Sequence, residues 1–202
     1  MNIAERFREV DELRKRVKGI DKDGWDHIKQ VTRLLHFPKD HLFIEPRLPC
    51  TKMGYVVRGI VMSFEYDIDD EKNVSQIYMN NLNPGVCDFK NFKSDRNTSL
   101  SFITLQPTTI LCIDKPAYLN LYSAVNNIEA ISYSILYDCM VDMTQYHVDK
   151  KNCNKEAFVL WFYNKYPILF DTTICERRFL TSYLGLGKDF ISKTLAKHGI
   201  II

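Results

Sequence analysis

The sequence predicts an α+β protein in which N-terminal helices and an antiparallel β-roll (a double-stranded β-helix or jelly roll) precede further helices. Three observations predict this class. Apolar residues recur at helical spacing over residues 2–18 and 23–35. Residues 37–115 instead contain short β-rich runs separated by Gly, Pro, Asn and Asp. Helical spacing then returns from Pro116 and continues through a C-terminal pair of short helices.

The β-rich region contains several strands with turn residues between them, as in a small sandwich or jelly roll. Asn83-Pro84-Gly85 is the clearest turn, and Arg58-Gly59 breaks the longest run into two strands. Asp21 or Asp23 is expected to cap the second helix, and Pro38 to end it. The predicted strand runs are His41–Glu45, Tyr55–Asp67, Val74–Asn80, Leu100–Leu105 and Thr109–Asp114.

Composition narrows the classes of function. The chain has 202 residues, 46% of them hydrophobic and 26% charged, with a net charge of +2, so it is globular and any nucleic-acid signal must be local. No apolar run approaches the length of a membrane span, and the charged N-terminus is unlike a signal peptide. We therefore expect a cytoplasmic protein with no membrane partner.

Catalytic and metal motifs are missing from the sequence. The five histidines form no metal-binding spacing, and there is no phosphate-binding loop or nucleophile elbow. The six cysteines form no CxxC pair and are expected to be mostly small buried hydrophobes, Cys139 included, although its helix would allow a disulfide between two chains. We predict that the chain is not an enzyme and assign it no cofactor.

A helix is predicted from Pro116 to about Asp149, which at 1.5 Å per residue is longer than one small core can cover. Part of its apolar seam is therefore expected to face a second copy of the chain. The alternative is an ordinary core helix that breaks near Asn126-Asn127. The seam consists of Leu121, Val125, Ile128, Ile135, Cys139, Met143 and Tyr146.

The C-terminal helices are predicted at Glu176–Leu184 and Lys188–His198, with Leu184-Gly185-Leu186-Gly187 as the turn. Residues 173–202 hold five basic and two acidic residues, a net charge of +3. One side of the second helix is apolar, and the other offers short polar and cationic side chains, as the DNA major groove requires. A plain helical hairpin with a solvated charged face is the alternative.

The layout resembles the Crp/Fnr family of bacterial transcription regulators, in its short Bacteroidetes-type form. Tyr55-Val56-Val57-Arg58-Gly59 looks like the strand–Gly–strand signature of the family, and Asn83-Pro84-Gly85 precedes its effector cassette. Ser182-Tyr183-Leu184-Gly185-Leu186, followed by Ile191-Ser192-Lys193, is similar to its helix-turn-helix. The resemblance divides the chain into a cyclic-nucleotide-binding-like sensor (1–115), a dimerisation helix (116–150) and a helix-turn-helix domain (151–202).

The resemblance implies a homodimer that reads a palindromic site on double-stranded DNA, with RNA polymerase as a further candidate partner. It places Lys188, Asp189 and Lys193 at base-contacting positions of the recognition helix. Backbone contacts would come from the remaining polar and basic residues of the helix pair, and no wing is expected to add to them. These residues are Ser192, Lys197, Arg177 and Arg178.

The sensor region departs from the family pattern. Cyclic-nucleotide binders use a carboxylate for the ribose and an arginine for the cyclic phosphate. Here Asp88 is the nearest acid, and Asn97 stands where arginine is expected, with Arg96 one residue early. We therefore do not expect cAMP to bind. Arg96, Thr98 and Ser99 either hold another small anion or are only loop residues.

The predicted function is therefore a dimeric regulator controlled by an unidentified effector at a degenerate cyclic-nucleotide-type pocket. The alternative is a ligand-binding or protein-interaction module that no longer reads DNA.

Overall fold

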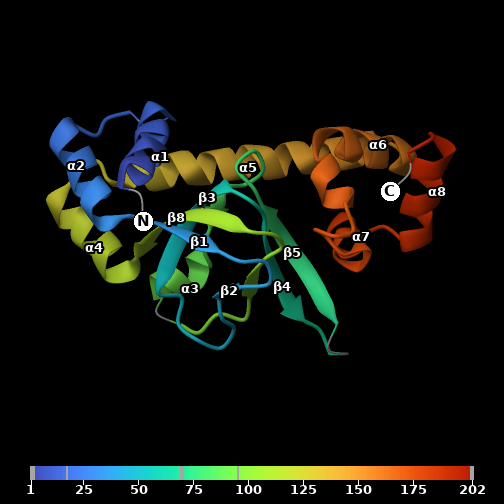
Figure 1. The fold of residues 1–202 in the computed structure, drawn as a ribbon, viewed down its shortest axis with the longest axis horizontal. Coiled ribbons are helices and arrows are strands. Elements are labelled where there is room, and N and C mark those ends of the chain that lie inside the picture. The colour runs from blue at the N-terminus through green and yellow to red at the C-terminus, as the bar shows by residue number, and fades with distance from the viewer. Residues whose placement is uncertain (1–2, 17, 69–70, 95, 201–202) are drawn as a thin grey trace.

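The computed structural model describes residues 3–16, 18–68, 71–94 and 96–200. Two antiparallel four-stranded sheets form the centre of this part of the chain, and helices flank them at both ends (Figure 1). The helices are α1 (Ile3–Arg16), α2 (Lys22–Val31), α3 (Phe89–Ser94), α4 (Lys115–Ala124), α5 (Glu129–Asn152), α6 (Lys155–Lys165), the 3₁₀ helix η1 (Pro167–Phe170), α7 (Arg177–Leu184) and α8 (Lys188–Lys197). The strands are β1 (Arg33–Phe37), β2 (Leu42–Ile44), β3 (Lys52–Arg58), β4 (Val61–Tyr66), β5 (Lys72–Tyr78), β6 (Gly85–Val86), β7 (Ser101–Thr104) and β8 (Thr108–Asp114).

The sheets are stacked as a roll. The first has the order β1-β8-β3-β6 and the second the order β2-β7-β4-β5. Buried side chains of both sheets, among them Val56, Ile110, Val61 and Phe102, fill the space between them. This interior is the first of three hydrophobic clusters, and the helices build the other two on the outer faces of the sheets.

The two outer clusters hold different helices. Against the first sheet, Leu111 and Ile113 pack with apolar residues of α1, α2 and α4. Against the second sheet, Met62 and Phe64 pack with α6, η1, α7 and α8. Helix α5 runs along the whole molecule from the first group of helices to the second (Figure 1). A displacement of α5 would therefore move both groups of helices.

Local signals explain several boundaries. Asp21 caps α2 as predicted, because its carboxylate accepts a hydrogen bond of 2.7 Å from the Gly24 N–H. Gly59 joins β3 to β4 with φ +98°, and a Cβ there would lie 2.7 Å from the Cα of Thr108. Only glycine fits both the backbone conformation and the space. The strand–Gly–strand expectation is therefore confirmed.

The continuous helix predicted over 116–149 is wrong. It breaks between α4 and α5, where Asn127 has φ +59° and its side-chain amide donates to the Gly19 carbonyl at 3.0 Å. Asparagine tolerates this left-handed conformation better than most residues, so the alternative of a break near Asn126-Asn127 is right.

The predicted seam also faces inward. Leu121, Val125 and Ile128 are buried under α1 and α2. Cys139 is buried. Tyr146 packs against the cluster that α6, η1, α7 and α8 form with the second sheet, which we call the C-terminal cluster. Met143 is 44% exposed. The side chain of Ile135, also in the predicted seam, lies outside those described. The buried residues of the predicted seam therefore cannot contact a second copy of the chain.

Three smaller expectations need correction. Residues 33–35, predicted as the end of the second helix, belong to strand β1, which pairs with β8. Strand β6 and helix α3, which follow the Asn83-Pro84-Gly85 turn, were not predicted. Positions 2 and 17 of the first predicted helix, and positions 201–202 at the end of the chain, lie outside the described residues.

Candidate nucleic-acid interface and effector cassette

The C-terminal helix pair has the predicted bounds to within one residue. Helix α7 ends at Gly185, which has φ +65° and ψ +36° and donates its N–H to the Thr181 carbonyl at 2.9 Å. The Leu186 N–H reaches the same carbonyl at 3.2 Å, so the left-handed residue closes the helix end. Gly187 is extended and caps α8. This short turn holds the two helices at a defined angle.

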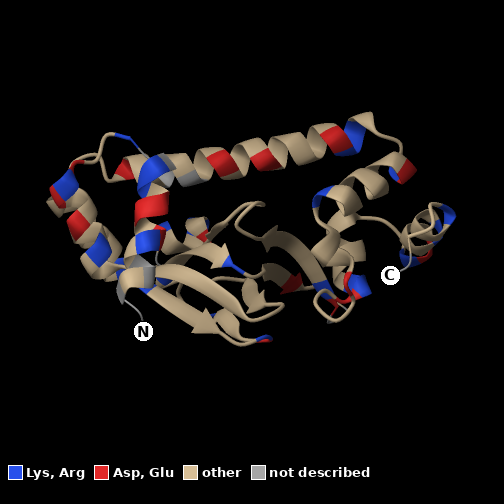
Figure 2. Ribbon diagram, turned by 45° about the horizontal axis from the view of Figure 1, so that its top comes forward, with Lys and Arg blue, Asp and Glu red and all other residues tan. Residues whose placement is uncertain are grey.

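Helix α8 has one buried and one exposed side. Ile191 and Leu195 are fully buried in the C-terminal cluster, together with Phe162 of α6. On the other side Lys188 and Lys193 are exposed, and they make no ion pair or hydrogen bond with other described residues. We call Lys188, Asp189 and Lys193 the outward face of α8. Figure 2 shows these charges at the end of the molecule remote from α1.

The two arginines of the predicted interface have partners on their own helix pair. Arg177 donates to the hydroxyl of Ser192 at 3.4 Å, which links α7 to α8. Arg178 pairs with Glu176 at 2.8 Å and lies 4.9 Å from the ring centre of Phe179. Ser192 is half-buried and therefore lies at the edge of the outward face.

Lys197 is occupied as well. Its ammonium and the ring of His198 each lie 2.8 Å from a single carboxylate oxygen of Glu156, on α6. Hydrogen bonds from Lys197, and then from His198, lower the pKa of the Glu156 carboxyl. These contacts hold the last turn of α8 against α6, so a phosphate that approaches Lys197 competes with a carboxylate.

Helix α7 is docked on the roll. The Val74 N–H, on edge strand β5, donates to the hydroxyl of Ser182 at 2.9 Å. An open cleft of about 450 Å³ lies between the helix turn and the β4–β5 hairpin, and its lining includes Lys188, Asp67 and Glu71. Two carboxylates of the hairpin thus line the same cleft as the start of α8 and oppose a polyanion there, although Lys72 and Arg178 of the same lining attract one.

In the predicted effector cassette, Asp88 and Thr98 meet. Asp88 is 6% exposed and accepts hydrogen bonds from the Asn91 N–H (3.2 Å) and side-chain amide (2.7 Å). The Thr98 hydroxyl, itself buried, also donates to this carboxylate. Asp88 therefore caps α3 and fastens residue 98 to it, which is a structural role.

The other three cassette residues do not join this pair. Arg96 and Asn97 are exposed, and exposed Ser99 donates to Glu65 at 2.8 Å. Beside Asp88 the roll interior is filled by Phe92 and Phe102, which are 5% and 0% exposed. The structure thus brings together two of the five predicted residues and leaves the rest on the surface.

Two cysteines that sequence spacing did not connect lie side by side under the cassette. The sulfur atoms of Cys50 and Cys87 are 4.0 Å apart, and both side chains are buried. The hydrogen bond from Cys87 lowers the pKa of Cys50 to about 7, and the same contact, with burial, raises the pKa of Cys87. Burial raises the pKa of Cys139, in keeping with the packing role expected for it.

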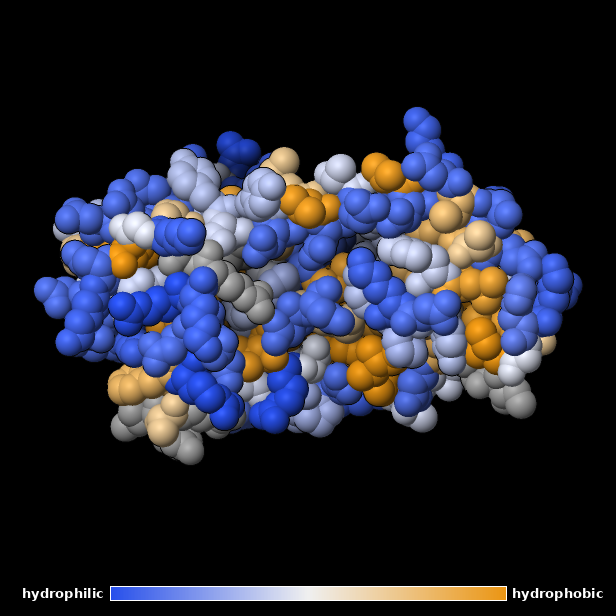
Figure 3. Space-filling view, turned by 90° about the horizontal axis from the view of Figure 1, so that it is seen from above, coloured by the Kyte–Doolittle hydropathy of each residue, from blue (hydrophilic) through white to orange (hydrophobic). Residues whose placement is uncertain are grey.

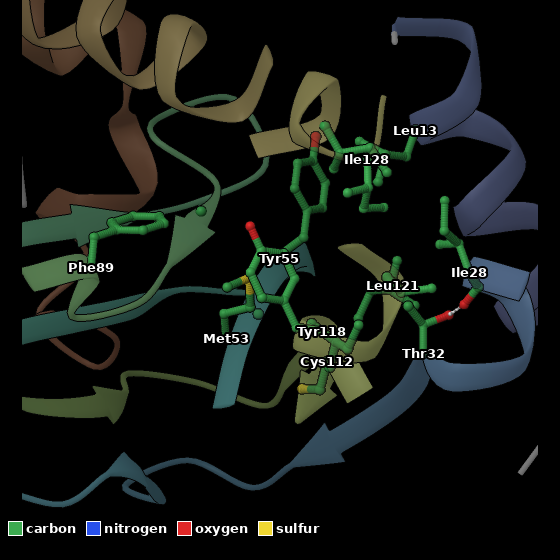
Figure 4. Close-up of a pocket in the computed structure, with 15 residues that line it drawn as sticks. Leu13, Ile28, Thr32, Met53, Tyr55, Phe89, Cys112, Tyr118, Leu121 and Ile128 are labelled. Carbon is green, nitrogen blue, oxygen red and sulfur yellow. Dashed lines mark hydrogen bonds between the residues drawn. The ribbon is translucent and has the colours of Figure 1, made fainter. Parts of the chain in front are cut away.

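Sequence reasoning also missed an apolar cavity on the outer face of the first sheet (Figure 4). Its walls come from β3, β6, β8 and five helices, α1 to α5, that are far apart in the chain. The four consecutive apolar residues of β8, Ile110–Ile113, are typical of a strand that is covered on both faces, but no sequence signal predicts a void. Within the described residues, no group of three or more His, Cys, Asp or Glu side chains is placed to hold a metal ion.

Comparisons with known proteins support the fold. Neither a family model nor a curated protein sequence matches the chain. Solved structures do match, at low identity. A regulatory protein of Silicibacter pomeroyi DSS-3, named for cAMP binding, is 11% identical, with a TM-score of 0.61 over 88% of this chain and 80% of its own. FixK2 of Bradyrhizobium japonicum is 15% identical, with a TM-score of 0.54 over 83% and 84%.

The global regulator CLP of Xanthomonas campestris, described as responsive to c-di-GMP, is 14% identical, with a TM-score of 0.54 over 89% of this chain and 92% of its own. The chain therefore has the fold of cyclic-nucleotide-binding-type regulators, a mixed α+β fold with two antiparallel sheets. Among the described helices, none is both long and apolar enough to span a bilayer.

Proposed function

We propose that this chain is a DNA-binding transcription regulator of the Crp/Fnr type. The observation that carries the proposal is the outward face of α8. Two lysines are exposed on it and pair with no other described residue, while the opposite side of the helix is anchored in a hydrophobic cluster. A helix that is fixed behind and cationic in front is what major-groove recognition requires. The likeness to CLP, which is described as a global regulator, agrees with this function.

The regulator acts as a homodimer through the outer side of α5. Exposed apolar residues recur along this side at intervals of three, four or eight residues. Figure 3 shows this face of the molecule from above. The largest exposed fractions on this side belong to Tyr133 (68%), Tyr137 (68%) and Met140 (66%), followed by Val141 (48%) and Val148 (43%). Such a stripe on a 24-residue helix suits a helix–helix interface. It replaces the buried seam that the sequence predicted.

A dimer with one α8 in each half reads a palindromic site whose half-sites are about 34 Å apart, one turn of DNA. Lys188, Asp189 and Lys193 contact bases, and Ser192 and the arginines contact the backbone at the edge of the groove. Because Asp88 and Thr98 bind each other, the cassette is a weak candidate for the effector site. RNA polymerase is the second macromolecular partner.

One observation favours a second function, a ligand-binding or protein-interaction module that does not read DNA. Helix α7 is hydrogen-bonded to β5, and Asp67 and Glu71 lie beside the start of α8. If this docking never opens, the two carboxylates stay in the same cleft as Lys188 and oppose a duplex there.

Fluorescence anisotropy with a labelled duplex from the region upstream of the protein's own gene separates the two functions. The regulator binds it far more tightly than a scrambled duplex, and its affinity falls steeply as salt rises from about 50 to 200 mM. Equal binding to both duplexes, or none to either, at every salt concentration favours the second function. Light scattering at the same concentrations reports the dimer, and Tyr137→Glu on the α5 stripe is expected to give monomers.

A further inference from the structure

The proposed function leaves unexplained an apolar cavity between the first sheet and the helices that cover it. About 80 Å³ of space lies between β3 and β8 on one side and α1, α2, α4 and α5 on the other (Figure 4). That is several times the 10–15 Å³ or so that one water molecule needs. Its walls include Met53, Leu111, Leu121, Ile128 and Ile131.

The walls carry no charged side chain, and three of their four polar side chains have a hydrogen-bond partner among the described residues. The Thr32 hydroxyl donates to the Ile28 carbonyl at 2.8 Å, and the Cys112 thiol donates to a carbonyl of its own strand at 3.6 Å. The Tyr118 hydroxyl shares a hydrogen bond of 2.9 Å with the hydroxyl of Tyr122, one turn further along α4. Water gains little in such a space, because it needs two to four polar partners. A charged ligand would lose its hydration without replacement.

The cavity also has an entrance. Met53, Tyr55 and Tyr118 are only half-buried, and Phe89 of α3 is 39% exposed. The residues at the rear, Leu121 and Ile128, are 4% and 2% exposed. The space therefore opens toward the surface near α3 and closes toward α4 and α5.

We propose that this cavity binds a small uncharged apolar molecule, such as a short alkyl chain or a single aromatic ring. The interior of the roll is filled beside the cassette, whereas this cavity has space for a ligand and no charge to recognise a nucleotide. Because Ile131 lies in the first turn of α5 and Ile128 directly precedes this helix, an occupant alters how α5 sits on the sheet. The cavity would then be the effector site, an assignment that rests on the proposed function. Binding of the apolar molecule there would shift α5, the helix that carries the exposed apolar stripe.

The probe is fluorobenzene, followed by ¹⁹F NMR as the full-length protein is added. We expect saturable broadening of its resonance. Leu121→Phe, which fills the rear of the cavity, is expected to weaken binding at least tenfold, and Ile131→Phe is a second filling variant. Leu119→Phe makes a similar change on the same helix at a side chain that is 53% exposed, and is expected to bind like the wild type. The charged ring 4-fluorobenzoate is expected not to bind.

Thermal unfolding verifies that each filled variant is folded. The proposal is overturned if fluorobenzene does not bind the wild type, if it binds folded Leu121→Phe and Ile131→Phe as tightly as the wild type, or if 4-fluorobenzoate binds equally well. DNA affinity measured with and without saturating fluorobenzene tests the effector role separately, and an unchanged affinity overturns that role. Loss of all DNA binding with fluorobenzene binding intact overturns the proposed function and leaves the cavity assignment standing.

Discussion

The outward face of α8 and the effector cassette were both predicted as polar binding sites, but their polar side chains differ in whether they are free to bind a partner. Lys188 and Lys193 are both exposed on a helix whose rear is buried, so one rigid element presents both charges. In the cassette, Asp88 is engaged by Asn91 and Thr98, while Arg96 is exposed. A set of charges becomes a binding surface when one rigid element presents it, and α3, with six residues, is too short to do so.

The largest expected effect concerns the anchor behind α8. Phe162 is fully buried in the cluster that joins α6, α7 and α8 to the second sheet. Phe162→Ala is expected to lower the free energy of unfolding by about 3–5 kcal/mol, because it leaves a cavity there. Urea unfolding measures it. The 98% exposed Ile68 provides the control Ile68→Ala, with a change within about 0.5 kcal/mol. A loss below about 1 kcal/mol for Phe162→Ala would mean that the anchor is loose.

The next effect tests the outward face directly. Lys188→Ala and Lys193→Ala are each expected to weaken specific DNA binding by about 1–3 kcal/mol and to lower the salt slope. Lys90→Ala removes an exposed lysine from α3 and is expected to leave both unchanged. If all three variants bind DNA alike in anisotropy titrations, the outward face of α8 is not the interface.

For the cassette, a structural role and a ligand role predict opposite outcomes. Asp88→Ala removes the cap of α3 and the partner of Thr98, so we expect about 1–2 kcal/mol of lost stability by urea unfolding. Arg96→Ala is expected to change stability by less than about 0.5 kcal/mol. Saturable cAMP binding by the wild type in calorimetry, abolished by Arg96→Ala, would show that the cassette is a ligand site after all.

A smaller effect is expected at the cleft beside α8. Glu71→Gln removes a negative charge near Lys188 and is expected to strengthen DNA binding about twofold to fivefold at low salt, with the gain fading as salt rises. Glu129→Gln makes the same change at the far end of α5 and serves as the control. Equal affinities for the two variants would mean that the hairpin does not oppose the duplex.

The smallest effect is a dependence on pH. The pKa of Glu156 is lowered from its ordinary value of 4.5 in the folded protein, so its pairing contributes stability above that value and loses it as the pH falls. The Tm difference between wild type and Glu156→Gln is therefore expected to be largest near about pH 6 and to vanish toward about pH 3. A difference that is constant over this range would rule out the pairing.

Local chemistry made much of the fold predictable. The break at Gly59, the cap at Asp21 and the turn at Gly185 are each dictated by one residue's conformation or side chain, so the sequence predicted them. Residues 33–35 were misread because their apolar spacing fits a helix as well as a strand, and only pairing with β8 decides between them.

By itself, the sequence determined the broad order of N-terminal helices, a strand-rich region and further helices, and the cationic side of α8, because these follow from periodicity and turn residues within short segments. The tertiary structure alone decided which side of α5 is buried, that Asp88 is engaged by Thr98, and that Cys50 lies beside Cys87. It also decided that a cavity remains under α4 and α5. Each of these depends on contacts between segments distant in the chain, and no local pattern encodes how their surfaces meet.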